Sequence, residues 1–410
     1  MLPDEIVYEL RSKVRAEIDF SGALSDEELM CKTEQTVFRW CEKRPLTASD
    51  KIGLVRRIFY SFRGLDVLQP LMDDPAVSEI MINSFDEVFI EKDGVMSHLP
   101  AAFESKERLE DLIQTIVAGV NRVVNEASPI VDARLRDGSR VHVVLPPVAL
   151  KGPSLTIRKF PDRPISMDDL VKYDSLSQEA ASFLKELVEA KYNIFISGGT
   201  GTGKTTFLNA LSQFIPGDER VVTIEDSAEL QIRSVPNLVK LETRNANTEG
   251  RGEITIKDLI RASLRMRPDR IVVGEVRGFE ALDMLQAMNT GHEGSISTGH
   301  GNNCRDMVGR LETMALSAAE LPLSVIRGQI ASALDIIVHL SRFRDRSRKV
   351  VEICEVAGIE NGEVKLVSLF RYCETGEHGG KISGMLQRTG CPLSKTEKLR
   401  MAGKEVGYGT

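Results

Sequence analysis

The sequence predicts an α/β protein whose main domain is a parallel-rich sheet covered by helices on both faces, with an α+β domain and a helical segment before it. Three observations predict this class. Between residues 165 and 345, short apolar runs alternate with stretches of helical periodicity, which is typical of a parallel sheet buried on both faces. Residues 71–160 instead combine strand-like runs with one helical stretch. Residues 1–70 carry helix signals.

The first 70 residues are expected to form a small helical segment that packs on another part of the protein. Ser25 followed by Glu28 matches a capping box, in which each side chain bonds the backbone N–H of the other residue. Apolar residues recur on one face of the helix that follows. Residues 1–19 and 49–62 are also typical of helices.

The α+β domain is expected over residues 71–160. A helix is expected over residues 106–123. The strand-like runs cover residues 78–83, 87–94, 139–147 and 154–160. The two prolines of PDRP (residues 161–164) interrupt regular structure. They predict a linker over residues 161–175.

The main domain is expected over residues 176–373. Its expected helices cover residues 177–190, 204–215 and 279–288, and another begins after a cap at Thr255. Its expected strands cover residues 193–196, 220–225 and 270–274. Asn361-Gly362 lies between two apolar-rich runs and predicts a hairpin over residues 345–373. Residues 374–410 are rich in glycine, lysine and threonine, and we expect a loosely ordered tail there.

Composition limits the classes of function. The 410 residues suggest two or three domains. The 53 basic and 60 acidic residues give a net charge of −7, which argues against a general electrostatic grip on nucleic acid but leaves room for a local basic patch. No run approaches the roughly 18 apolar residues of a membrane span. The N-terminus has no apolar signal-peptide core, so we expect a cytoplasmic chain that reaches a membrane through a partner.

Cysteine spacing gives no zinc signal. No two of the six cysteines form a CxxC pair, so free thiols are expected rather than a structural zinc site. The cysteines are Cys31, Cys41, Cys304, Cys354, Cys373 and Cys391.

The clearest chemical signal is a glycine-rich loop between an expected strand and an expected helix. It reads GGTGTGKTT and matches the phosphate-binding pattern G-x-x-x-x-G-K-[ST]. Glycines let successive backbone N–H groups point at a phosphate, and the helix adds the positive end of its dipole. Lys204 is expected to reach the β- and γ-phosphates of ATP, and Thr205 to ligate Mg²⁺. The loop residues are Gly198, Gly199, Thr200, Gly201, Thr202, Gly203, Lys204, Thr205 and Thr206.

Two expected strands end in carboxylates, and the carboxyl ends of parallel strands meet at the ligand-binding edge of a sheet. The run VVTIED ends in Glu225 and Asp226, with Glu229 beyond it. Glu225 either orients water or Mg²⁺ or is a solvated acid in a loop. The run RIVVGEVR places Glu275 where it can act on the attacking water as a general base.

The magnesium ligands expected at this edge are few. Gly274 stands where this element usually directs an aspartate at Mg²⁺. The metal is therefore expected to rely on Thr205 and water, with Glu225 or Glu275 acting through water.

Two of the six histidines follow in one polar, glycine-rich segment that can sense the γ-phosphate. His300 is expected to be a sensor, and His292 is either a second sensor or a structural histidine. Glu229, Gly274 and Arg277 are placed with His292 in the same nucleotide-sensing group.

A basic group lies upstream of the loop. Such arginines suit a domain that closes over a nucleotide, its own or a neighbour's, in the manner of an arginine finger. The alternative is surface charge that solvates the domain. The residues are Arg134, Arg136, Arg140, Arg158 and Lys159.

The ordered set GGTGTGKTT, VVTIEDSAEL, RIVVGEVRG and TGHEGSISTGH resembles the Walker A, acidic, Walker B and His boxes of type II and type IV secretion and pilus ATPases. Segments outside the boxes, such as SPIVDARLRDGSRVHVVLPP, resemble the CpaF-like branch, which assembles Flp (tight adherence) pili. The resemblance runs from about residue 70 to 345. Two features depart from the wider pattern: Gly301 stands where the His box usually has alanine, and the CxxC pairs of many type II members are missing.

The resemblance implies a homo-hexameric ATPase motor with a RecA-like domain after a PAS-like α+β domain. It implies that Glu275 is the catalytic carboxylate and that Glu225 assists it. It also implies that arginines matching Arg134, Arg140 and Arg158 reach the γ-phosphate as the domains close.

The implied partner is an inner-membrane platform protein, which would place the motor at the inner face of the membrane, with no specific nucleic acid. The alternatives are a type IV secretion or conjugation ATPase, a nucleic-acid-translocating ATPase, and a scaffold that binds ATP only to assemble.

Overall fold

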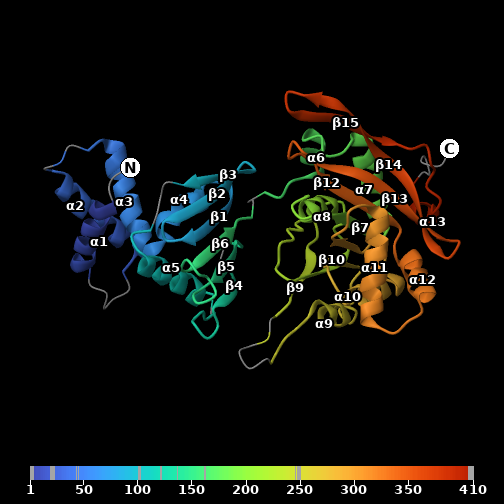
Figure 1. Ribbon diagram of the computed structural model, residues 1–410, viewed down its shortest axis with the longest axis horizontal. Coiled ribbons are helices and arrows are strands. Elements are labelled where there is room, and N and C mark those ends of the chain that lie inside the picture. The colour runs from blue at the N-terminus through green and yellow to red at the C-terminus, as the bar shows by residue number, and fades with distance from the viewer. Residues whose placement is uncertain are drawn as a thin grey trace. The chain divides into compact units, whose positions relative to one another are not determined.

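The computed structural model describes residues 4–18, 24–42, 44, 46–99, 103–120, 122–135, 137–160, 163–244, 246 and 251–404. The chain divides into two compact units, residues 1–162 and 163–410 (Figure 1). Within those described ranges, no helix is both long and apolar enough to cross a membrane.

The first unit begins with three helices around their own apolar core. They are α1 (Asp4–Glu17), α2 (Asp26–Cys41) and α3 (Ala48–Arg63). The capping box predicted at Ser25 and Glu28 is confirmed, because each side chain bonds the other residue's backbone N–H. Arg11 of α1 pairs with Glu104 of the following domain at 2.9 Å.

The rest of the first unit is an antiparallel sheet with one long helix, α5 (Lys106–Ala118), packed on it. Two short helices precede the sheet, η1 (Asp66–Leu68) and α4 (Gln69–Asp73). The strands lie in the order β3-β2-β1-β6-β5-β4. They are β1 (Val77–Ser84), β2 (Glu87–Lys92), β3 (Val95–Leu99), β4 (Ile130–Arg134), β5 (Arg140–Val144) and β6 (Ser154–Arg158). Strands β3 and β4 are not among the strands that the sequence predicts.

The predicted linker over residues 161–175 is wrong in its second half. Pro161 and Asp162 lie outside the described residues. Ser166 caps a helix, α6 (Met167–Lys172), through a capping box with Asp169. Met167 and Leu170 are buried in the core of the second unit, so apolar packing orders this segment despite the prolines.

The second unit (Figure 1) is built on a nine-stranded sheet. Its strands lie in the order β15-β14-β13-β12-β7-β11-β10-β8-β9. The six strands from β12 to β9 are parallel, and β13 to β15 form an antiparallel meander beside β12. The parallel strands are β7 (Ile194–Gly198), β8 (Arg220–Glu225), β9 (Asn237–Glu242), β10 (Arg270–Val276), β11 (Ile296–Gly299) and β12 (Ile336–Arg342).

Helices cover both faces of this sheet, which confirms the predicted fold class. One apolar cluster includes α6, α7 (Gln178–Glu189) and α8 (Lys204–Ser212). The other includes α9 (Ile256–Ser263), α10 (Glu280–Asn289), α11 (Cys304–Ala318) and α12 (Leu323–Ala333). Strand β7 contributes to both clusters: Ile194 and Ile196 pack in the first, and Phe195 in the second.

The hairpin predicted around Asn361-Gly362 is confirmed. Strands β13 (Arg348–Glu360) and β14 (Glu363–His378) are joined by these two residues, whose φ angles are +52° and +78°. Positive φ at both central residues is the geometry of the turn that Asn-Gly favours.

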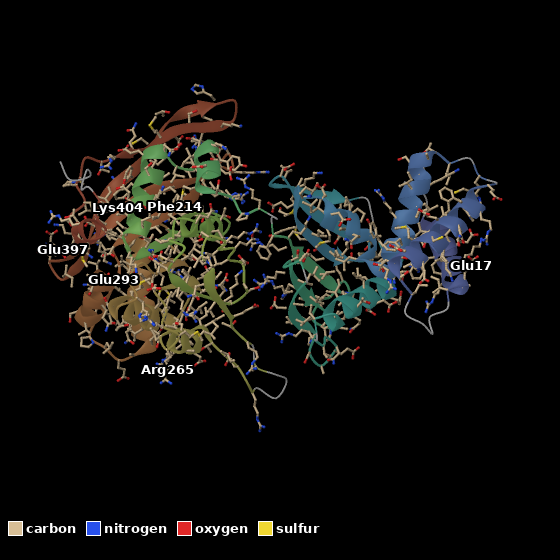
Figure 2. The ribbon with its side chains drawn as sticks, turned by 180° about the vertical axis from the view of Figure 1, so that it is seen from behind. Glu17, Phe214, Arg265, Glu293, Glu397 and Lys404 are labelled. Carbon is tan, nitrogen blue, oxygen red and sulfur yellow. The ribbon has the colours of Figure 1, made fainter. Side chains whose placement is uncertain are left out.

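The expectation of a loosely ordered tail from Glu374 is wrong for the part that the structure describes. Strand β14 continues to His378, and β15 (Lys381–Arg388) and α13 (Glu397–Met401) follow. Three buried leucines, Leu386, Leu393 and Leu399, anchor the segment in the core. Lys404 pairs with Glu189, and Lys398 lies 3.7 Å from Glu293; Figure 2 labels Lys404 and Glu293 on the same unit. Residues 405–410 lie outside the described residues.

Candidate active site

The glycine-rich loop runs from the end of β7 to the start of α8, at the carboxyl edge of the parallel strands (Figure 1). Gly201 and Gly203 have φ angles of +71° and +91°, where a side chain is strained. Thr202 Oγ1 donates to the Gly199 carbonyl at 2.9 Å and holds the curve of the loop. A Cβ at Gly198 would lie 2.7 Å from the Leu340 carbonyl oxygen, so the loop can pass the neighbouring strand only without a side chain there.

Lys204 lies inside the curve of this loop. Its Nζ donates to the carbonyls of Gly198 (3.1 Å) and Gly199 (2.9 Å) and lies 3.4 Å from His300 Nδ1. Burial lowers the pKa of Lys204, with Glu275 acting against that shift and Arg277 adding to it. Carbonyl dipoles hold this ammonium group without neutralising it. A phosphate at the loop would supply the opposite charge.

Glu275 lies between two cationic or potentially cationic side chains. Its Oε1 is 2.7 Å from His300 Nε2, a contact that is not aligned as a hydrogen bond. Its Oε2 accepts from Arg277 Nε (2.8 Å) and Nη2 (2.5 Å). The structure therefore brings Lys204, His300, Glu275 and Arg277 into one connected group. Thr298 Oγ1 donates to the Gly274 carbonyl at 2.7 Å and joins the ends of β11 and β10.

Glu225 ends β8 but turns into the loop that follows it. Its Oε1 accepts from the backbone N–H groups of Glu229 (2.8 Å) and Leu230 (2.9 Å), while its Oε2 is buried without a hydrogen-bond partner among the described residues. The solvated-acid alternative is wrong, because only 3% of Glu225 is exposed. A Cβ at Gly274 would approach Glu225 Cγ to 3.0 Å, so an aspartate at position 274 would crowd this carboxyl.

The comparisons with known proteins agree with this architecture. Residues 63–396 match the family model of the type II/IV secretion system proteins. The chain belongs to the type II/IV secretion system protein family. A putative conjugal transfer protein of Mycobacterium tuberculosis is 36% identical over 315 residues, which cover 75% of this chain and 88% of that protein. The type IV secretion system protein VirB11 of Brucella suis is 33% identical over 319 residues, which cover 71% and 88%.

A solved structure shows the shared fold of this secretion-system protein. The ATPase DotB of Legionella pneumophila matches 71% of this chain and 80% of its own chain, with a TM-score of 0.52 and 21% identity.

The structure does not place His292 beside His300. His300 follows the carboxyl end of β11, whereas His292 precedes the amino end of that strand. The His292 carbonyl accepts from Ser295 Oγ at 2.7 Å, and the Ser295 N–H donates to Asn193, which precedes β7. His292 therefore lies at the opposite edge of the sheet from the loop. Of the two alternatives for His292, this position favours a structural histidine, because a strand separates it from His300.

Three candidate arginines of this secretion-system protein form a row in the first unit. Arg134 of β4 is in register with Arg140 of β5, and Arg140 with Arg158 of β6. Arg140 lies 3.3 Å from Asp132, and Arg158 lies 3.7 Å from Glu79. Like charges directly opposite on neighbouring strands are destabilising, and Asp132 and Glu79 offset part of this repulsion. Arg136 lies outside the described residues.

Two residues that support the site were missed by sequence reasoning. The Glu280 carboxylate accepts from the backbone N–H groups of Arg277 (2.6 Å) and Gly278 (2.9 Å) and fixes the turn after β10. Arg348 Nε donates to the Gly201 carbonyl at 2.9 Å, which ties the loop to the start of β13. Glu280 comes three residues after Arg277, a spacing typical of a cap, whereas Arg348 reaches the loop only through the fold.

A pH dependence of stability follows from Glu225. Burial raises the pKa of Glu225 to about 7, outweighing the backbone hydrogen bonds that lower it. Between about pH 4.5 and 7 the folded chain keeps this proton while the unfolded chain loses it, so the unfolded state binds fewer protons and stability falls as pH rises. A shift of this size corresponds to about 3 kcal/mol. We expect urea unfolding at pH 5 and pH 8 to show this loss in the wild type and not in Glu225→Gln.

The matched control is Glu229→Gln, which removes a charge from the same loop. Burial is the largest cause of the raised pKa of Glu225 and the charge of Glu229 is a smaller one, so this variant should keep most of the wild-type pH dependence. An equal pH dependence in Glu225→Gln and the wild type would contradict the raised pKa.

Proposed function

We propose that the protein is an ATP-hydrolysing motor that powers a secretion or pilus-assembly machine. The observation that carries the proposal is the group Lys204–His300–Glu275 beside a loop with phosphate-binding geometry. The family membership and the similarity to VirB11 support the secretion context.

A cavity beside the loop has room for the rest of a nucleotide. It has a volume of about 260 Å³ and lies against Thr202, Gly203 and Thr206. Apolar and basic side chains line its other walls, including Leu170, Tyr173, Phe207, Arg346 and Arg348. We place the base and ribose of ATP there, with the phosphates directed along the loop.

The oxygen donors near the loop fit Mg²⁺, which prefers hard oxygen ligands. Thr205 stands in the first turn of α8, and Glu225 has a buried carboxylate oxygen without a partner among the described residues. We propose that Thr205 holds the ion directly and that Glu225 or Glu275 acts through water. When bound, Mg²⁺ neutralises phosphate charge in the transition state.

The side chains of the group divide the work of hydrolysis. Burial, followed by the charge of Lys204, lowers the pKa of His300, which favours the neutral ring. Lys204 can only donate, so Nδ1 of that ring is the acceptor and the proton sits on Nε2, facing Glu275. We propose that His300 turns to align Nε2 with Glu275 Oε1 and so orients the carboxylate. Glu275 then takes a proton from the attacking water, and Lys204 moves from the loop carbonyls to the phosphates.

The direct test of the proposed function is nucleotide binding and turnover by the purified chain. We expect calorimetry to show Mg²⁺-dependent binding of ATP and a phosphate-release assay to show steady hydrolysis. Binding of AMP should be much weaker, because the loop and Lys204 act on the β- and γ-phosphates. Failure to bind ATP with Mg²⁺ would overturn the proposal, and binding without hydrolysis, even with membranes added, would favour the scaffold alternative.

The arginine row is proposed to contact the γ-phosphate of the chain's own ATP or of a neighbour's. Arg158→Ala and Arg140→Ala are expected to lower the turnover number by about tenfold or more, since an arginine finger stabilises transition-state charge. ATP affinity should change less. Lys151→Ala, an exposed basic residue of the same unit, is the control and should behave like the wild type. Unchanged turnover in both arginine variants would contradict this proposal and would show that these arginines serve only as surface charge.

The assembly and the machine are further proposals. We propose a homo-hexamer at the inner face of the cytoplasmic membrane, held there by an inner-membrane platform protein of a Flp-like pilus. The second candidate is a type IV secretion or conjugation ATPase, which the similarity to the putative conjugal transfer protein favours. Deleting the gene separates the two: loss of surface pili supports the first and loss of plasmid transfer supports the second. Mass measurement with ATP present tests the hexamer.

A further inference from the structure

Two cysteines and a glutamate that are distant in sequence meet on one face of the large sheet. Cys304 is the first residue of α11, and Glu352 and Cys354 lie two residues apart on β13. Residues at that spacing share one face of a strand, and α11 packs against β13 on that face (Figure 1). One ligand atom from each side chain lies within 4.8 Å of the other two. Within the described ranges, no other group of this kind has three or more members.

The surroundings give the three side chains different access to solvent. Cys304 and Cys354 are 1% and 3% exposed and lie in the apolar cluster beneath α11. The Glu352 side chain is 20% exposed, and its Oε1 accepts from Arg371 at 2.9 Å. The two thiol groups are therefore buried, and the Glu352 carboxylate lies at the solvent-exposed side of the group, from which an ion can enter.

We propose that Cys304, Cys354 and Glu352 form a binding site for a thiophilic divalent metal ion of the zinc type, with water as the fourth ligand. Zinc binds cysteine sulfur at about 2.3 Å and carboxylate oxygen at about 2.0–2.2 Å in tetrahedral sites. Ligand atoms around such an ion are about 3.5–3.8 Å apart. To bind the ion, the distances between the three ligand atoms need to shorten by no more than about an ångström.

The neighbours of the group fit this use. A carboxylate that binds a metal is commonly held by a second hydrogen bond from outside the site, and Arg371 supplies one to Glu352. The absence of a CxxC pair does not exclude the site, because its cysteines come from two segments that only the fold brings together.

A metal ion here would join the start of α11 to the antiparallel part of the sheet. Cys304 follows His300 by four residues, so the ion would also anchor the segment that carries His300. Because the ion binds the folded chain, it should raise the unfolding temperature.

The test is a cobalt titration of the full-length reduced protein, in which the three exposed cysteines are replaced: Cys31→Ser, Cys373→Ser and Cys391→Ser. We expect one Co²⁺ per chain, with the thiolate-to-cobalt absorption band and the visible bands of a tetrahedral site, and loss of both when Zn²⁺ is added. Adding Cys304→Ser or Cys354→Ser should abolish the thiolate band. Adding Glu352→Gln should weaken cobalt binding by about tenfold or more.

The control is Cys41→Ser in the same background, since Cys41 is also buried but lies in the first unit. It should bind cobalt like the parent. X-ray absorption of the zinc-loaded parent needs no variant at the site and should show two sulfur ligands. No thiolate band, an unchanged band in Cys304→Ser, or a Cys304–Cys354 disulfide in place of bound metal would overturn the proposal. The readout involves no nucleotide, so it is independent of the proposed ATPase.

Discussion

Replacing Glu275 with glutamine is expected to lower the turnover number for ATP by about 10²–10⁴-fold, the usual contribution of a general base. Glutamine has nearly the same shape but cannot take a proton from water. The side chain contacts His300 and Arg277 rather than the loop backbone, so ATP affinity should stay within a few fold of the wild type. Phosphate release under saturating ATP measures the first quantity, and calorimetry with Mg²⁺ and ATP measures the second.

Two controls separate proton transfer from the simple loss of a charge. Glu293→Gln removes a carboxylate at the opposite edge of the sheet, where Glu293 lies 3.7 Å from Lys398, and should leave turnover unchanged. Arg277→Gln leaves Glu275 in place but removes its cationic partner. If Glu275 serves only to hold Arg277, the two variants will lose turnover equally. A much smaller loss in Arg277→Gln supports the role of Glu275 as a base.

The parts of the site that are continuous in sequence could be predicted from the sequence. The phosphate-binding loop from Gly198 to Thr206 could be predicted from its residue spacing alone, because the glycine conformations and the helix that follows are local properties of the chain. Glu275 was found because it ends an apolar strand. The Asn361-Gly362 turn was likewise visible, since its two residues determine its geometry.

The features that the sequence did not reveal depend on the three-dimensional course of the chain. Glu225 ends a strand in the same way as Glu275, yet backbone N–H groups of its own loop hold it in the interior. His292 is close to His300 in sequence, but four strand residues carry the two to opposite edges. The C-terminal residues look loosely ordered by composition, but Leu393 and Leu399 pack in the core. Burial by remote elements decided only the last case, whereas a local loop holds Glu225 and the course of one strand separates the two histidines.

Replacing Lys204 with alanine is expected to reduce turnover by about 10²–10³-fold, comparable to the loss of one charge-stabilising donor. ATP affinity is expected to fall by about 10–100-fold, because a charged hydrogen bond is lost. The stability of the folded chain without ATP, in contrast, should not fall. The pKa of Lys204 is lowered by burial, so the charged form is disfavoured in the folded chain and its removal should leave the free energy of unfolding near pH 7 unchanged or higher.

These opposite signs make the experiment decisive. Thermal unfolding with and without ATP should show a stabilising shift in the wild type and little shift in Lys204→Ala, although the variant without ligand unfolds no earlier than the wild type. Lys185→Ala is the matched control, because Lys185 is an exposed lysine of the same unit, and it should keep the shift. If Lys204→Ala unfolds earlier and still shows the full shift with ATP, Lys204 supports the fold and the phosphates bind elsewhere. If Lys204→Ala is as stable as the wild type but ATP no longer raises its unfolding temperature, the phosphates bind at the glycine loop. The substitution then weakens the complex with ATP and not the fold.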